Sequence, residues 1–189
     1  MGPIEFLGDY IDGRFVKPDR ADGEFKSVSP GDLKDVISHL EYRHEHIGMA
    51  TKAARDAFPK WARMPQEQRF ALLRKLKDVY TAHADQLTET IARETGKPKW
   101  DSAGEAKAMI NKIDITLDHS MRLVKQERIA NALPGVDGVV THMARGVMAV
   151  LGPFNFPGHL PNGHIVPALA TGNTVVFKPS ELTPMVGQL

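Results

Sequence analysis

The chain of 189 residues contains no cysteine. Within these residues, this absence excludes disulfide bonds, cysteine-ligated zinc and any thiol nucleophile. An excess of charge of one sign is also lacking, since 24 Lys and Arg residues stand against 23 Asp and Glu residues. Nucleic-acid-binding domains usually carry a marked basic excess, so we expect no nucleic-acid partner. A reducing compartment is compatible with this composition, and we expect a cytoplasmic protein.

Long apolar runs are missing as well. The first ten residues have no basic start and no long apolar stretch, so we do not expect them to form a secretory signal. No segment approaches the length of a membrane span, and we expect no membrane partner. The length suits one large domain or one and a half, and the 42% hydrophobic content is typical of a globular protein.

The first forty residues are expected to be rich in β-structure, and three or four helices should follow. Asp12-Gly13 between apolar runs predicts a hairpin, and residues 29–32 predict a second turn. The expected helices are 45–58 ended by Pro59, one starting near Pro65, 85–94 ended by Gly96, and a long one from Ser102 with Glu105 completing a capping box. Residues 134–138 are expected to form a loop or hairpin turn, followed by a strand at 139–143.

The last part of the chain predicts a parallel βαβ crossover. An apolar strand at 147–150 leads into the run Leu-Gly-Pro-Phe-Asn-Phe-Pro at 151–157. A Gly-rich helix follows, ends at Gly172, and gives way to a second apolar strand that closes on residues 178–181. Ligands of open α/β sheets bind at the carboxyl ends of the strands, so both loops are candidate binding segments.

Asn155 is the first candidate for chemistry. A neutral amide donor aimed at a reacting oxygen can stabilise an oxyanion. The alternative is that Asn155 only bonds local backbone in a turn, as Asn often does. The pattern leaves both interpretations open.

Lys178 and Glu181 could both bond the sugar hydroxyls of a nucleotide. A carboxylate at this position would repel a 2′-phosphate and favour NAD over NADP. The alternative is a surface ion pair of little energetic weight. No Gly-x-Gly-x-x-Gly or Walker sequence occurs, so another loop would have to hold a dinucleotide. His159 and His164 are five residues apart and do not share a helix face, so we expect no metal site.

The stretch from Gly146 to Pro184 resembles the aldehyde dehydrogenase superfamily. Its Pro-Phe-Asn-Phe-Pro core, its Ala-Leu-Ala-Thr-Gly-Asn segment and its Lys-Pro-Ser-Glu loop occur in the order typical of that family. The resemblance implies an α/β fold, in which β-hairpins and helices lead into an incomplete Rossmann-like parallel sheet. It also implies NAD as cofactor, a small-molecule aldehyde as substrate, and a homo-oligomer when the enzyme is complete.

The resemblance further assigns roles to individual residues. Asn155 would donate to the oxyanion. Phe156, His159 and Gly163 would lie at the mouth of a substrate tunnel. The cofactor-binding residues would be Leu151, Gly152, Pro153, Phe154, Lys178, Ser180 and Glu181.

The catalytic cysteine, the general-base glutamate and the Gly-rich cofactor loop lie further downstream in this family. We therefore expect residues 1–189 to be the N-terminal part of an NAD-binding domain, without the catalytic domain and inactive by itself. Residues 125–145 are expected to contribute a strand or hairpin to an oligomerisation region. The alternative is a naturally short, non-catalytic module that binds a ligand or another subunit with the same partial fold.

Overall fold

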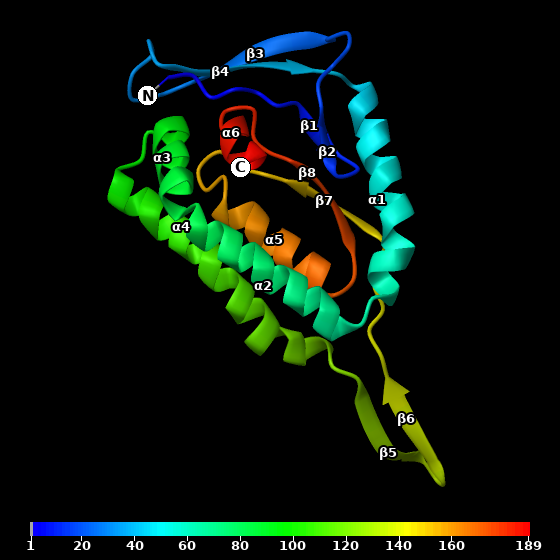
Figure 1. Cartoon of the computed structure of the whole chain (residues 1–189). Helices are drawn as coiled ribbons and strands as arrows, with labels where there is room; N and C mark the ends of the chain where they lie inside the picture. Colours follow the sequence, from blue (N-terminus) through cyan, green and yellow to red (C-terminus); the bar gives the residue numbers. More distant parts are fainter. Residues whose placement is uncertain (1) are drawn as a thin grey trace.

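The computed structural model describes residues 2–189 and shows an α/β protein, as the sequence predicts (Figure 1). The strands are β1 Asp9–Ile11, β2 Arg14–Val16, β3 Gly23–Val28, β4 Val36–Tyr42, β5 Glu127–Leu133, β6 Val136–Val140, β7 Val147–Leu151 and β8 Thr174–Lys178. The helices are α1 Glu45–Arg63, α2 Gln66–Ala82, α3 Ala84–Thr95, α4 Lys99–Asp114, α5 His159–Ala170 and α6 Pro184–Gln188. A π-helical turn, Ile115–His119, and a 3₁₀ turn, Ser120–Val124, prolong α4.

The N-terminal part consists of two antiparallel hairpins, and the predicted turns are confirmed. Asp12 and Gly13 join β1 to β2 with φ values of 51° and 80°. Positive φ at both central residues is the requirement of a type I′ turn, which matches the twist of the flanking strands. The second predicted turn, at residues 29–32, lies between β3 and β4.

The prediction that Pro59 ends the first helix is wrong, because α1 continues through Pro59 to Arg63. A proline inside a helix loses one hydrogen bond, although its fixed φ suits helical backbone. The turn beyond it is held by tertiary contact, since the Trp61 indole Nε1 donates to the Leu169 carbonyl oxygen at 3.0 Å. Packing against α5 therefore outweighs the local preference for a helix end.

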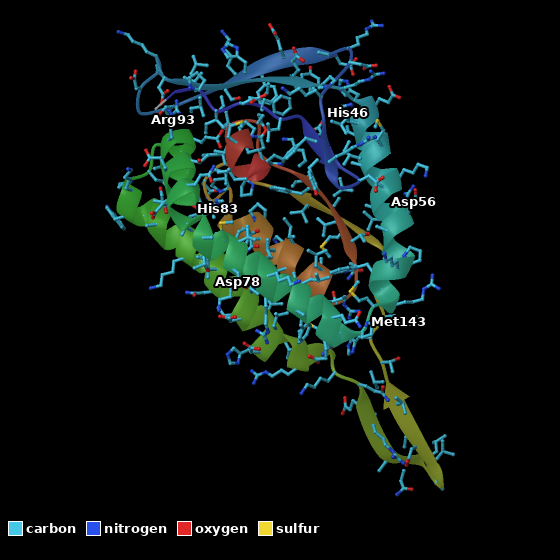
Figure 2. All side chains as sticks on the ribbon, viewed as in Figure 1. His46, Asp56, Asp78, His83, Arg93 and Met143 are labelled. Atoms are coloured by element: carbon cyan, nitrogen blue, oxygen red, sulfur yellow. The ribbon has the colours of Figure 1, made fainter. Side chains whose placement is uncertain are left out.

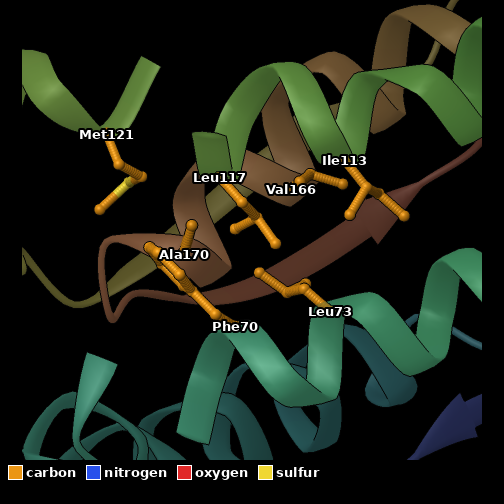
Figure 3. Close-up of a cluster of buried hydrophobic side chains, with 7 residues drawn as sticks. All are labelled: Phe70, Leu73, Ile113, Leu117, Met121, Val166 and Ala170. Atoms are coloured by element: carbon orange, nitrogen blue, oxygen red, sulfur yellow. The ribbon is translucent and has the colours of Figure 1, made fainter. Parts of the chain in front are cut away.

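The main hydrophobic core lies between α2, α4 and α5 (Figure 3). The apolar face of α2 and the C-terminal end of α4 face this core, while Ala106 and Met109, earlier on α4, pack with Leu87 of α3 in a second cluster. α5 is largely apolar, and its buried residues Val166 and Ala170 join this core. The buried members are Phe70, Leu73, Ile113, Leu117, Met121, Val166 and Ala170.

The predicted parallel βαβ crossover is confirmed. β7 and β8 pair in parallel, from Val147 opposite Thr174 to Leu151 opposite Lys178. Both α5 and α1 contact the pair, and Figure 1 places β7 and β8 between them. Gly172 turns the chain from α5 into β8 with a φ of 88°, which favours glycine.

A hairpin of β5 and β6 extends away from the rest of the molecule (Figure 1). The predicted strand at 139–143 is displaced, since β6 begins at Val136 and ends at Val140. Pro134 and Gly135, with φ 75° at the glycine, complete the turn in two residues and free the chain to pair from Val136. All residues of β5 are exposed, and Met143, where the hairpin joins the body, is 84% exposed (Figure 2).

Candidate functional site

The segment between β7 and α5 carries Asn155 at the carboxyl edge of the parallel pair. The ladder runs one residue past β7, since the Gly152 N–H donates to the Lys178 carbonyl oxygen at 2.9 Å. Leu151, Phe154 and Asn155 are exposed, while Gly152 and Pro153 are half-buried. Within residues 2–189, no hydrogen bond engages the Asn155 amide, which leaves its N–H groups free for a ligand.

The loop after β8 brings Lys178 and Glu181 to the same edge. Their side chains form an ion pair, Nζ to Oε2, of 2.9 Å and are 60% and 68% exposed. The hydrogen bond from Lys178 lowers the pKa of Glu181 below its usual value. Ser180 is buried, and its Oγ accepts the N–H of Leu182 at 3.2 Å, so it shapes the loop. An exposed pair of this kind adds little stability but remains free to bind hydroxyl groups.

The predicted capping box of Ser102 and Glu105 is wrong. α4 begins at Lys99, three residues earlier, and Ser102 is completely buried. The Glu105 side chain is also completely buried, and it reaches across to α5. Its Oε1 accepts the N–H groups of Gly158 at 3.0 Å and His159 at 3.1 Å. Glu105 therefore caps α5 rather than α4, because it lies on the buried face of α4, which packs against the start of α5.

Lys97 joins Glu105 to the segment that carries Asn155. Its Nζ lies 2.9 Å from Glu105 Oε2 and 3.5 Å from the centroid of the Phe156 ring. The Phe156 ring in turn meets the His159 ring edge-on, with centroids 6.5 Å apart. Sequence reasoning missed Lys97 and the true role of Glu105. The signal was present, because Glu105 lies on the same helical face as Met109 and Ile113, which are buried.

The three residues expected at a substrate tunnel lie in the first turns of α5 or, for Phe156, three residues before it. Phe156 is exposed, His159 is half-buried, and no atom lies within 4 Å of a Cβ placed on Gly163. The space beside Gly163 can therefore admit another group. The Nδ1 atom of His159 is buried and has no hydrogen-bond partner within residues 2–189.

In the part of the chain that the structure describes, no group of three His, Asp or Glu side chains is placed to hold a metal ion. None of the helices over residues 2–189 is long and apolar enough to cross a membrane.

The exposed Lys178 ammonium and Glu181 carboxylate offer a donor and an acceptor suited to the hydroxyl groups of a nucleotide ribose.

Residues 15–189 match the model of the aldehyde dehydrogenase family, and the chain belongs to this family. It is 53% identical, over 184 residues, to N-succinylglutamate 5-semialdehyde dehydrogenase from Salmonella dublin, covering 96% of this chain and 35% of that one. The resemblance predicted from the Pro-Phe-Asn-Phe-Pro core and the Lys-Pro-Ser-Glu loop is thereby confirmed. Segments 53–69 and 91–113 upstream also resemble N-succinylglutamate 5-semialdehyde dehydrogenases in sequence, and the 53% identity over nearly the whole chain agrees with this narrower resemblance.

Solved structures give the same result for the fold. Lactaldehyde dehydrogenase from Escherichia coli superposes with a TM-score of 0.88 at 33% identity, over 98% of this chain and 38% of that one. 1-Pyrroline-5-carboxylate dehydrogenase from Thermus, solved with bound NAD, gives a TM-score of 0.82 at 25% identity, over 98% of this chain and 35% of that one. The chain spans about a third of the length of the curated relatives it matches.

Proposed function

We propose that this chain supplies the oxyanion donor and the ribose side of the cofactor site in an NAD-dependent aldehyde dehydrogenase. The proposed reaction is the oxidation of N-succinylglutamate 5-semialdehyde to N-succinylglutamate in arginine catabolism. The observation that carries the proposal is the parallel pairing of β7 and β8, which puts the Asn155 segment and the Lys178–Glu181 loop at one edge. The 53% identity to an enzyme named for this substrate supports the choice of aldehyde.

Asn155 would act on the oxygen of the aldehyde. In the family mechanism a cysteine thiolate adds to the carbonyl carbon, and the carbonyl π electrons move to the oxygen, which becomes negatively charged. The Asn155 side-chain N–H would donate to that oxygen, and an exposed amide without an internal partner is available to do so. Phe156 and Gly163, on the accessible side of the start of α5, would border the path of the substrate.

Lys178 and Glu181 would hold the adenine ribose of NAD through its hydroxyl groups, beside the strand end at residues 151–154. NAD supplies the acceptor for the hydride that leaves the substrate. The Glu181 carboxylate, whose pKa is lowered by Lys178, is ionised at neutral pH and would repel the 2′-phosphate of NADP. A cytoplasmic location, where NAD is available, fits this proposal.

The test is the Asn155→Ala variant of the whole protein. Loss of one oxyanion donor should lower kcat by about 10²-fold or more, while NAD affinity changes little. Single-turnover kinetics should be used, so that slow product release does not hide the effect. An unchanged single-turnover rate would return Asn155 to a structural role.

The 189-residue chain by itself should not oxidise aldehydes, because it contains no thiol nucleophile. Turnover of succinylglutamate semialdehyde with NAD, measured on protein free of host dehydrogenases, would contradict the thiolate mechanism. We expect the chain alone to bind NAD only with millimolar affinity, about −4 kcal/mol, which calorimetric titration can measure.

We also propose that the hairpin of β5 and β6 pairs with another copy in a homo-oligomer. A two-stranded hairpin is marginally stable alone and leaves its edges unpaired. Ile129, Val136 and Val139 are 44%, 52% and 55% exposed on it, which favours contact with a partner. A charge at Val139 should shift the oligomer towards smaller species in sedimentation velocity, whereas an unchanged distribution would exclude the hairpin as an interface.

A further inference from the structure

The segment that carries Asn155 is anchored at its far end by a single buried carboxylate. Glu105 has no exposed side-chain surface. Its Oε1 accepts the two amides, Gly158 and His159, that open α5, and its Oε2 pairs with the Lys97 ammonium at 2.9 Å. A negative charge at a helix N-terminus is favourable, and a buried charge persists only when it is paired and hydrogen-bonded. Here both conditions are met.

Lys97 contacts the same segment at a second point. Its Nζ lies 3.5 Å from the centroid of the Phe156 ring, and Phe156 directly follows Asn155. Lys97 is itself 15% exposed, so its contact with the ring is largely shielded from water. The ion pair therefore holds the chain both one residue and three residues beyond Asn155.

A further bond ties α5 to α4. The Asn162 Nδ2 donates to the Met109 carbonyl oxygen at 3.1 Å, one turn beyond the amides that Glu105 accepts. By contrast, Asn155 has no hydrogen bond of its own within residues 2–189. Its position thus depends on the ladder bond of Gly152 before it and on the tethers that follow it.

We propose that Glu105 and Lys97 are positioning residues that hold the Asn155 amide where the oxyanion forms. This inference rests on the proposed function. A donor stabilises an oxyanion only if it is fixed before the charge develops, and a displacement of about 1 Å can cost up to 10²-fold in rate. The buried ion pair can fix the segment of Asn155 in this way, because Glu105 lies on α4 and Lys97 lies in the turn before α4, both outside that segment.

Glu94 provides a matched control. It is also a buried glutamate that accepts two amides at a helix start, from Met185 at 3.0 Å and Val186 at 2.9 Å. It caps α6, however, and its side-chain hydrogen bonds go to Ser27, Met185 and Val186 rather than to the segment of Asn155. Its variants should therefore disturb folding to a similar degree without moving the oxyanion donor.

The experiment measures single-turnover rates of the whole protein with NAD and succinylglutamate semialdehyde. Glu105→Ala should lower the rate about 10- to 100-fold and leave the KM for NAD within about threefold. Glu105→Gln should recover most of the rate, because its carbonyl oxygen still accepts the two amides. Glu94→Ala should keep the single-turnover rate at saturating NAD.

The decisive step is a double-mutant cycle with Asn155→Ala. If Glu105 acts through Asn155, then Glu105→Ala should have no further effect in the Asn155→Ala background. Lys97→Met, which removes the ammonium from the Phe156 ring, should show a smaller loss with the same dependence on Asn155. This second variant keeps the test decisive if Glu105→Ala does not fold. Additive losses, or losses equal to those of Glu94→Ala, would overturn the proposal.

Hydrogen exchange separates this inference from the proposed function. The amides of Gly158 and His159 should lose protection in Glu105→Ala and keep it in Glu94→Ala, whether or not the protein is active. Retained protection in Glu105→Ala would overturn the tether. Inactive wild-type protein, or full activity of Asn155→Ala, would overturn the proposed function while leaving the exchange result intact.

Discussion

A side chain at Gly158, where α5 is capped, should destabilise the protein. A Cβ at this position would lie 2.5 Å from the Met109 Sδ and 3.3 Å from its Cε. The φ of Gly158 is −93°, which alanine adopts readily, so the cost is one of packing and not of backbone strain. Met109 is only 5% exposed and has little room to move. Overpacking of this kind costs about 1–3 kcal/mol.

Gly163 in the same helix is the matched control. Nothing lies within 4 Å of a Cβ there, and alanine is favoured over glycine inside a helix by roughly 0.5–1 kcal/mol. The melting temperature should therefore fall by roughly 2–12 °C in Gly158→Ala and rise by roughly 1–4 °C in Gly163→Ala, at about 2–4 °C per kcal/mol. Thermal unfolding of the two variants measures both shifts. In a Met109→Ala background the penalty at Gly158 should shrink. Equal shifts for the two glycines, or an unchanged penalty without Met109, would refute the steric explanation.

The other predictions concern a titrating carboxylate, an indole and the cofactor. Burial raises the pKa of Glu94, so folded protein binds its proton more tightly than unfolded protein. Wild-type stability should then fall relative to Glu94→Gln as pH rises from about 4.3 through the raised pKa, by about 1.4 kcal/mol for each pH unit that separates the folded from the unfolded pKa. Urea unfolding at about pH 4.5 and 7.5 measures this, and a constant difference would contradict it. Trp61→Phe removes the hydrogen bond to the Leu169 carbonyl oxygen and should lower the free energy of unfolding by about 1 kcal/mol, measured by calorimetry. An unchanged free energy would show that this bond does not stabilise the end of α1. Glu181→Gln in the whole protein should reduce the ratio of kcat/KM for NAD over NADP, and an unchanged ratio would show that this carboxylate does not face the ribose.

Much of the fold could be predicted from local signals. Asp12-Gly13 specifies its turn because both residues must take positive φ, and few other pairs do so at low cost. The α3 end at Gly96, with a φ of 72°, follows from the same conformational freedom. Apolar runs on either side of a helical segment predict the parallel pair of β7 and β8. In each case the information lies within a few residues of the element itself.

The errors in the prediction have a common cause in long-range contact. Pro59 is a local signal for a helix end, yet the contact of Trp61 with α5, 108 residues away, keeps α1 helical to Arg63. Ser102 and Glu105 match a capping box, but both are buried, and the carboxylate caps a helix that begins 54 residues later. Local patterns cannot register partners at such separations.

The candidate site divides in the same way. The sequence by itself determined the types of residue at the sheet edge, an amide at Asn155 and opposite charges at Lys178 and Glu181, because their motifs are contiguous. Only the tertiary structure decided that Lys97 and Glu105 contact the segment that follows Asn155. Their ion pair is buried where α4 meets the start of α5. Burial is a property of the packed chain, because only packing removes the water that would otherwise solvate the carboxylate, the ammonium and the two amides. Without that water, these groups must satisfy one another.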